Sequence, residues 1–289
     1  MRQTLSDNER LSEEIKDIEC YVKSDKRQHI MIAKLSITPV FRDIENFSQF
    51  NELEYRRLSE LFRAFDLFKY KPLDAERNAL LLTNVNQVYR VCNKIMDWDI
   101  KGLIRFTKDL STFSNICGND QLALIKYGCF EILMLKYTML YDINTDYWTW
   151  ASSTVGPIVG AFKLDVLKYE KHNLYNHYKE YFYKVIPEWC QDYVIMDLLT
   201  AIVLFNPNRP NLTHRDVVKA EQQLYIYLLQ RYLYLKHQSG VETHRRLSKL
   251  LSPLTDLEMI CDIEKKNGLE FYLDSFGPIL KEILYDITK

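Results

Sequence analysis

Cysteine and histidine are the residues with which this 289-residue chain could bind a metal or build a nucleophile, and their spacing favours neither. The closest two cysteines, Cys117 and Cys129, are 12 residues apart, so no Cys-x-x-Cys pair exists for a zinc finger or ribbon. His172 and His177 are five residues apart, which is wrong for two ligands on one helical face. The sequence contains no Gly-rich phosphate loop and no Gly-x-Ser-x-Gly elbow. We therefore expect no metal site, no cofactor and no enzymatic activity.

The charge balance and the apolar runs disfavour several other classes of protein. Lys and Arg number 38 and Asp and Glu number 39, so the net charge of −1 gives no reason to expect binding to nucleic acid or to a membrane surface. No stretch of 18 apolar residues is present, which argues against a membrane span. Residues 1–12 contain no apolar run, so we expect no signal peptide and a reducing, intracellular compartment.

The apolar pattern from residue 53 onwards predicts a helical protein. Gly and Pro are scarce, at eight each, which favours long helices over many short strands. The segment 142–160, which contains two tryptophans, is the only plausible place for a small β-hairpin. The helix expected over 119–141 is apolar on nearly every side, which is typical of a helix at the centre of a protein. Helices are predicted over about 53–70, 84–110, 119–141, 162–185, 187–205, 213–236 and 241–266, and after Gly277-Pro278.

Three motifs resemble the ligand-binding domain of nuclear receptors. The block 106–126 runs Phe-Thr-Lys-Asp-Leu-Ser-Thr-Phe-Ser-Asn-Ile-Cys-Gly-Asn-Asp-Gln-Leu-Ala-Leu-Ile-Lys and matches the family signature. The segment 279–284, Ile-Leu-Lys-Glu-Ile-Leu, matches the activation helix, and 201–210 is similar to the family's helix break. Residues 127–136 look closest to the branch around the vitamin D receptor, beside arthropod and nematode sterol, lipid and xenobiotic sensors.

This resemblance implies a fold for most of the chain. It implies an all-α, three-layer antiparallel sandwich of about a dozen helices with one small β-hairpin, formed by residues 51–289. The activation helix is expected over 278–286. Residues 1–50 are polar and charged, and we expect them to be a partly helical N-terminal extension.

The resemblance also implies a surface that binds co-activator or co-repressor helices. Co-activators of the family present a short amphipathic helix with a Leu-x-x-Leu-Leu stripe. Lys108 and Lys126 match the cations that meet the carbonyl end of such a helix, and Glu282 matches the anion that meets its amide end. The apolar positions of the activation helix are Ile279, Leu280, Ile283 and Leu284.

A lipophilic ligand is expected between the long helix and the buried one. Asp99 and Lys136 are open to two interpretations: they orient the polar head of a ligand together, or they are a structural ion pair in a pocket filled by its own side chains. The positions implied by the vitamin D receptor pattern are Cys92, Ile95, Met96, Asp99, Ile100, Phe130, Leu133, Met134, Lys136, Tyr137, Leu140 and Trp148.

Further residues match structural and dimerisation positions of the family. Glu131 and Arg209 match an ion pair that ties the buried helix to the helix break. Leu250, Leu254 and Leu257 match the dimer surface, which implies a retinoid X receptor partner. Glu258, however, stands where the family commonly has Arg.

The function expected from these features is a ligand-responsive regulator of transcription, located in the nucleus, the cytoplasm or both, that binds a steroid, lipid or xenobiotic. The chain contains no zinc-finger DNA-binding domain, so we expect this chain itself not to bind DNA. The alternative is a ligand-independent interaction module that sequesters co-regulators or a dimer partner. A cavity of a few hundred Å3 would favour the first function, and a cavity near zero the second.

Overall fold

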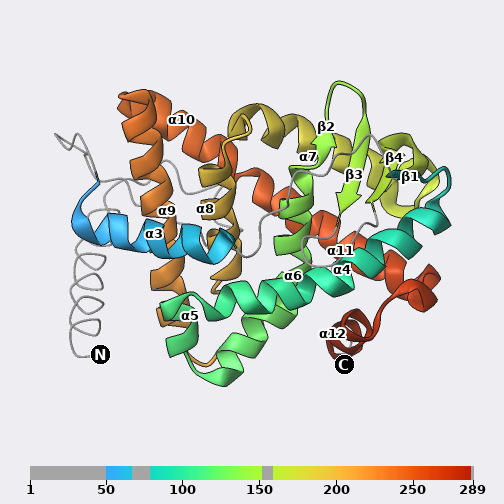
Figure 1. Ribbon diagram of the computed structural model, residues 1–289, viewed down its shortest axis with the longest axis horizontal. Coiled ribbons are helices and arrows are strands. Elements are labelled where there is room, and N and C mark those ends of the chain that lie inside the picture. Colours follow the sequence, from blue (N-terminus) through green and yellow to red (C-terminus); the bar gives the residue numbers. More distant parts are fainter. Residues whose placement is uncertain (1–49, 67–78, 152–158, 288–289) are drawn as a thin grey trace.

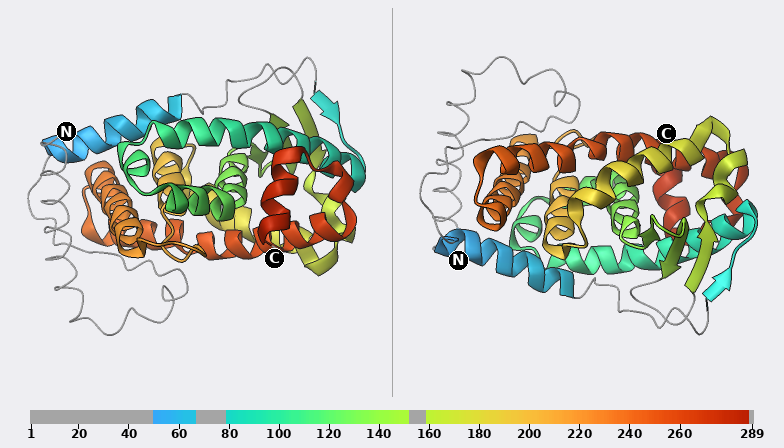
Figure 2. Two further views of the ribbon diagram at one scale, coloured as in Figure 1. Left: turned by 90° about the horizontal axis from the view of Figure 1, so that it is seen from below. Right: turned by 90° about the horizontal axis from the view of Figure 1, so that it is seen from above.

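The helices stack in three layers, which Figure 2 shows from two opposite sides. The structure is a computed structural model, and it describes residues 50–66, 79–151 and 159–287. Helices α3 and α4 form one outer layer and α7, α10 and α11 form the other, with α6, α8 and α9 between them (Figures 1 and 2). The expected all-α three-layer sandwich is therefore confirmed.

Ten α-helices occur in the described part of the chain. They are α3 (Glu52–Asp66), α4 (Val85–Lys108), α5 (Ser111–Asn115), α6 (Gly118–Thr138), α7 (Leu174–Trp189), α8 (Tyr193–Leu204), α9 (Arg215–His237), α10 (Gly240–Leu251), α11 (Pro253–Phe271) and α12 (Pro278–Ile287). Three short 3-10 helices are η1 (Leu164–Tyr169), η2 (Lys171–Asn173) and η3 (Leu273–Ser275). As its composition predicts, α6 is the central helix: every residue from 128 to 138 is buried.

The small sheet is larger than the expected hairpin. Strands β3 (Tyr147–Ala151) and β4 (Val159–Lys163) pair antiparallel, and β2 (Tyr141–Asp142) lies on the outer edge of β3. A further strand, β1 (Ala79–Leu81), pairs parallel with β4, so the order is β1-β4-β3-β2. The sequence does not reveal β1, because three residues are too few for an apolar alternation and the partner strand lies about 80 residues further on.

Two predicted helices are interrupted. In the first half of the helix expected over 162–185, the chain instead forms the end of strand β4, then η1 and η2. The α-helix α7 begins only at Leu174. His172 and Asn173 take left-handed backbone angles, with φ of 61° and 57°, which a continuous helix excludes. The expected helix over 241–266 is divided at Pro253, because proline has no amide hydrogen to donate within a helix.

The described residues contain no helix that is both long and apolar enough to cross a membrane. Most of the expected N-terminal extension, and the end of the helix expected over 53–70, lie outside the described residues.

Candidate functional site

Helix α12 packs across α4 and α6, with its amino end on the middle of α4 (Figures 1 and 2). The buried side chains of Leu280 and Leu284 are one helical turn apart, while Ile279 and Ile283 pack against the core and remain partly exposed. Glu282 points away from this apolar side and is exposed. The four predicted apolar positions of α12 thus dock the helix, and its acid stays available to a partner.

Asp97 of α4 caps the amino end of α12. The backbone amides of Ile279 and Leu280 donate hydrogen bonds to Asp97 Oδ1, over 2.9 and 3.0 Å. Asp97 is 6% exposed, so this carboxylate stabilises the positive end of the helix dipole within the protein. Asp97 was not predicted as a functional residue. The sequence contains one indirect signal, because Gly277-Pro278 opens the helix without a Ser, Thr, Asp or Asn that could cap it locally, so a cap must come from another element.

Two lysines stand on the elements that meet α12. Lys108 is the last residue of α4 and is exposed, and Lys126 lies on α6 with its Nζ atom 5.7 Å from the centre of the Tyr127 ring. One turn before each lysine is an apolar side chain, Ile104 on α4 and Leu122 on α6, and Leu122 is 65% exposed. We call Ile104, Lys108, Leu122, Lys126 and Glu282 the clamp surface.

The length of the clamp surface follows from the position of the cap. Lys108 is 11 residues beyond Asp97 on the same helix, which is about 16 Å along the axis at the α-helical rise of about 1.5 Å per residue. That span equals about three turns of helix. A short helix lying along α4 would therefore have positive charge at one end and Glu282 of α12 near the other.

A small cavity of about 30 Å3 lies among the described residues of the interior, between α4, α6, α11 and the sheet. Five of the predicted pocket residues line it, namely Cys92, Met96, Phe130, Met134 and Trp148. The other seven predicted residues lie outside its lining: Ile95, Asp99, Ile100, Leu133, Lys136, Tyr137 and Leu140. Lining residues that were not predicted are Val88, Tyr89, Asn93, Trp150, Phe162, Leu167, Glu264 and Phe276.

Asp99 and Lys136 are buried apart from this cavity, with exposures of 0% and 3%. Burial lowers the Lys136 pKa to about 7, and the charges of Asp99 and Asp197 oppose that shift. Tyr137 donates a hydrogen bond of 2.9 Å from its hydroxyl to Asp99 Oδ2. This buried polar cluster favours the structural interpretation of the pair over an anchoring role for a ligand.

Glu264 of α11 supplies an acid at the cavity instead. The hydroxyls of Tyr89 and Tyr178 donate hydrogen bonds to its carboxylate, over 2.7 and 2.8 Å. Burial raises the Glu264 pKa to about 7, although both tyrosine hydrogen bonds act in the opposite direction. No sequence signal marks Glu264, because α11 carries several other acidic residues and nothing in the sequence distinguishes Glu264 from them.

The structure forms the expected Glu131–Arg209 ion pair. Arg209 Nη1 lies 2.8 Å from Glu131 Oε1, and Arg209 Nη2 contacts Glu131 Oε2. Both side chains are buried, so the pair fastens the central helix α6 to the connection between α8 and α9. Its role is to hold the fold, as the resemblance implies.

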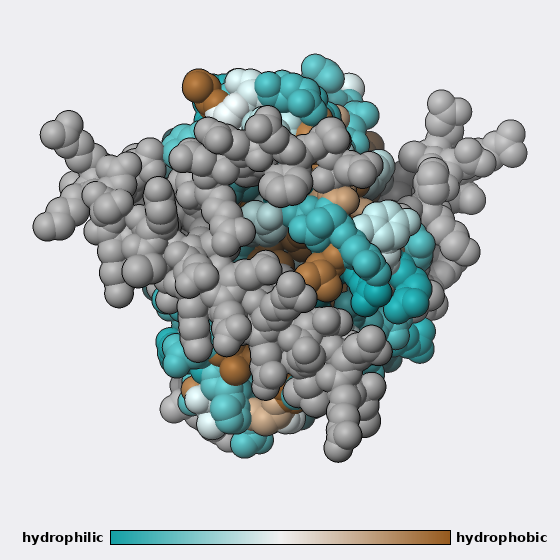
Figure 3. All heavy atoms as spheres, turned by 90° about the vertical axis from the view of Figure 1, so that its left-hand side faces the viewer, coloured by the Kyte–Doolittle hydropathy of each residue, from teal (hydrophilic) through white to brown (hydrophobic). Residues whose placement is uncertain are grey.

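The leucines expected at the dimer surface belong to the core. Leu250, Leu254 and Leu257 are 0%, 5% and 1% exposed, so a second chain cannot reach them on this monomer. The resemblance places them on a dimer surface, whereas in the structure their side chains face inward. The described residues at the end formed by α3, α9 and α10 are mostly polar, with small apolar areas between them (Figure 3).

Comparison with known proteins gives the family. The family model described as the ligand-binding domain of nuclear hormone receptor matches residues 86–267. Nuclear hormone receptor HR96 of Drosophila melanogaster is 30% identical over 244 residues, which cover 81% of this chain and 33% of that protein. The ecdysone receptor of Lucilia cuprina is 28% identical, covering 60% of this chain and 22% of the relative.

A mammalian relative points the same way. Nuclear receptor subfamily 1 group I member 2 of Mus musculus is 29% identical, over 55% of this chain and 35% of the relative. The chain thus spans about a third or less of the length of these three relatives. Because the family model covers more than half of the chain, the chain belongs to the ligand-binding domains of nuclear hormone receptors.

Proposed function

We propose that this domain recruits co-activators by binding a Leu-x-x-Leu-Leu helix on the clamp surface. The observation that carries the proposal is α12 docked on Asp97, because the cap holds the helix that carries Glu282 against α4 and α6, the helices that carry the two lysines. As a nuclear receptor ligand-binding domain, the chain is a non-enzymatic regulator of transcription.

The charges of the clamp surface suit the two ends of a short helix. The last carbonyl groups of a helix lack internal partners and carry partial negative charge, so Lys108 and Lys126 can donate to them. The first amide groups carry partial positive charge, which suits Glu282. Between these ends, Ile104 and the exposed Leu122 offer apolar contacts to the leucine stripe.

The interior cavity favours recruitment without a ligand. Ligand pockets in proteins typically measure about 300–1,000 Å3, whereas this one has about 30 Å3. Aromatic and methionine side chains fill the remaining space, and α12 is docked at the same time. We therefore favour the ligand-independent interaction module, in which the docked state of α12 is the resting state.

Control by a lipophilic ligand is the second candidate. Five of the twelve predicted residues line the cavity, and two of these, Met96 and Met134, are unbranched and adaptable, so they can make room for a ligand. Tyr89 and Glu264 offer polar groups to its head. The ligand class would be a sterol, another lipid or a xenobiotic, in keeping with a hormone receptor family.

Co-activator binding can be tested with a fluorescent Leu-x-x-Leu-Leu peptide and ligand-free protein. Glu282→Ala and Lys126→Ala should each lower the affinity for the peptide by about 10- to 100-fold, the usual effect of losing a hydrogen bond to a charged group. Lys168→Ala changes an exposed lysine of η1, outside the helices of the clamp surface, and should leave affinity unchanged. Equal affinity in all four proteins would refute the clamp.

Native mass spectrometry followed by organic extraction separates the two modes of control. A clean apo mass together with full peptide affinity supports the ligand-independent module. A co-purifying lipophile, or a peptide affinity that appears only after lipid is added, supports the second candidate. Lys136→Ala should not change lipid affinity if its ion pair is structural.

We also propose a retinoid X receptor as dimer partner and the nucleus as the place of action, as is usual in this family. Since the expected leucines are buried, the interface would use exposed residues of α10 and α11, such as Val241 and Met259. The domain would span residues 51–289.

A further inference from the structure

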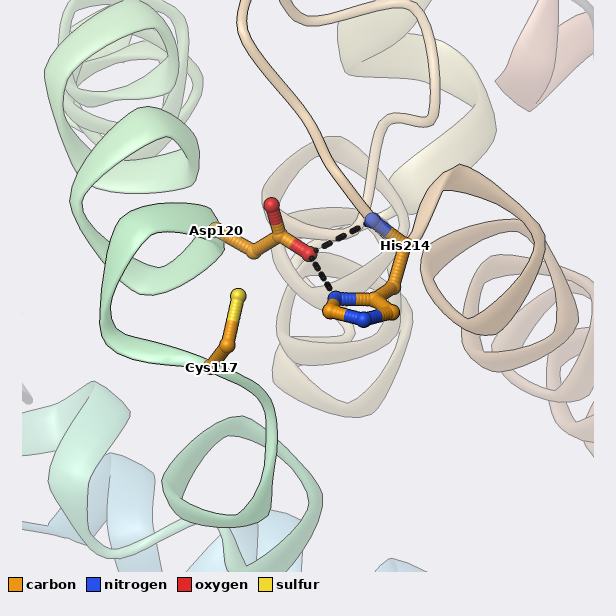
Figure 4. A group of neighbouring side chains, drawn as sticks. All are labelled: Cys117, Asp120 and His214. Atoms are coloured by element: carbon orange, nitrogen blue, oxygen red, sulfur yellow. Dashed lines mark hydrogen bonds and ion pairs between the residues drawn. The ribbon is translucent and has the colours of Figure 1, made fainter.

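A cysteine, an aspartate and a histidine meet where the central helix α6 begins (Figure 4). Cys117 is the residue before α6, Asp120 lies in its first turn, and His214 is the residue before α9. One ligand atom from each side chain lies within 4.8 Å of the other two. The histidine is 94 residues from the aspartate in sequence, so only the tertiary fold makes this cluster.

The spacing of these atoms is close to that of a tetrahedral metal site. With zinc bonds of about 2.0–2.3 Å to oxygen, nitrogen and sulfur, neighbouring ligand atoms lie about 3.3–3.6 Å apart. His214 Nδ1 and Asp120 Oδ2 are already 3.1 Å apart. The third ligand atom, Cys117 Sγ, lies within 4.8 Å of both of these atoms.

The surroundings keep Asp120 ionised and leave His214 accessible to solvent. Burial would raise the pKa of Asp120, but hydrogen bonds from Thr213, His214 and Cys117 hold it at about 2, so the carboxylate is ionised. The Asp120 side chain is fully buried, whereas 54% of the His214 side chain is exposed. An ion can therefore enter from the histidine side, and water can take a fourth position.

Cys117 is an unusual choice for its place in the fold. Helices favour Ser, Thr, Asp or Asn at the position before the first turn, because those side chains cap the amide groups. The Cys117 side chain makes no such bond, and its sulfur lies beside Asp120 instead (Figure 4). A thiol beside a carboxylate and an imidazole is a donor set that suits zinc.

We propose that Cys117, Asp120 and His214 bind a Zn2+ ion, with water as the fourth ligand. Binding replaces the hydrogen bond between His214 Nδ1 and Asp120 Oδ2 by bonds from both atoms to the metal. The Cys117 thiol gives up its proton to solvent, so affinity falls as pH decreases. The ion would fasten the start of α6 to the connection before α9. This inference does not depend on co-activator binding.

Cobalt serves as the spectroscopic probe, because Co2+ bound to a thiolate absorbs in the near ultraviolet through charge transfer from sulfur. The full chain, reduced and freed of metal, is titrated with Co2+ and then with Zn2+ in competition. The test variants are Cys117→Ser and His214→Gln. Cys190→Ser, which removes an exposed thiol outside the cluster, and Cys20→Ser, which removes the cysteine nearest the start of the sequence, serve as controls.

Both test substitutions were chosen so that the variants should fold as the wild type does. Serine is a better helix cap than cysteine, so Cys117→Ser should be at least as stable as the wild type without metal. His214→Gln keeps the backbone amides that bind Asp120, and the altered side chain is half exposed. Thermal unfolding without metal checks both variants.

The expected result is a sulfur-to-cobalt band in the wild type and both controls, absent from Cys117→Ser. Zn2+ affinity should fall at least about 10- to 100-fold in Cys117→Ser and His214→Gln, a loss that changes even to outer-shell groups can produce. Zn2+ should raise the Tm of the wild type but not of these variants. Equal Zn2+ affinity in wild type and Cys117→Ser, or a band lost in Cys190→Ser or Cys20→Ser, would overturn the proposal.

Discussion

The carboxylate of Asp97 lies 3.0 Å from the backbone nitrogen of Leu280, although 183 residues separate the two. This contact joins the middle of α4 to the first turn of α12, next to the buried side chain of Leu280 itself. It consists of protein groups alone, so docking of α12 requires no bridging molecule. The position of Glu282, and with it the clamp surface, depends on this cap.

Replacing Asp97 by alanine should weaken ligand-free binding of a Leu-x-x-Leu-Leu peptide by about 2- to 30-fold, which corresponds to the loss of a helix cap worth about 0.5–2 kcal/mol. Amide hydrogen exchange at Ile279 and Leu280 should speed up, because both amides lose their acceptor. Asp97→Asn keeps an acceptor oxygen and should retain most of the affinity. If exchange and affinity are unchanged in Asp97→Ala, the cap does not control docking.

Gly277→Ala should displace α12 by disturbing the same contact with Asp97. A Cβ atom at Gly277 would lie 2.3 Å from Asp97 Cγ, closer than carbon atoms approach without a shift of the chain. We expect lower peptide affinity and faster tryptic cleavage after Lys281, with little change in overall Tm. Gly240→Ala is the control, since nothing lies within 4 Å of the added methyl group there. Equal affinity of the two alanine variants would contradict this expectation.

The buried acid Glu264 should make stability depend on pH. Its pKa rises from 4.5 to about 7 in the folded protein, so between these values the folded state holds a proton that the unfolded chain releases. Stability from this group is complete below pH 4.5 and decreases as pH rises through 7.

Between pH 4 and 8 the free energy of unfolding should therefore fall more in the wild type than in Glu264→Gln, by on the order of 3 kcal/mol. Urea unfolding at several pH values measures the difference. Glu270→Gln, an exposed acid of the same helix, should follow the wild type. Parallel curves for wild type and Glu264→Gln would show that the buried acid is not the source.

Arg209→Met should destabilise the fold by about 3–5 kcal/mol, because it leaves the buried Glu131 without its cation. The double variant Glu131→Met/Arg209→Met should recover a substantial part of this loss, since no charge then stays buried. Urea midpoints at an unchanged m value measure both effects. A double variant less stable than Arg209→Met alone would mean that steric fit, and not the charge, dominates.

Elements with local signals can be predicted from the amino-acid sequence alone. The apolar face of α4 and the all-round apolar character of α6 follow from helical periodicity, and Gly277-Pro278 marks the start of α12. The signature motifs placed Lys108, Lys126 and Glu282 on three helices, and they paired Glu131 with Arg209 correctly. Such motifs work because each holds its residues at a fixed helical spacing.

Features that depend on which elements meet come from the tertiary structure. The resemblance matches Leu250, Leu254 and Leu257 to a dimer surface, but the local sequence does not show whether their side chains face a neighbouring helix or a second chain. The five predicted pocket positions on α4 share one face of that helix, yet the cavity volume depends on how side chains from α6, α11 and the sheet fill the space between. The Asp97 cap and the Cys117–Asp120–His214 cluster join residues from distant segments. Hydrogen bonds and metal ligands act over about 2–3 Å, so only the packing of the helices could create them.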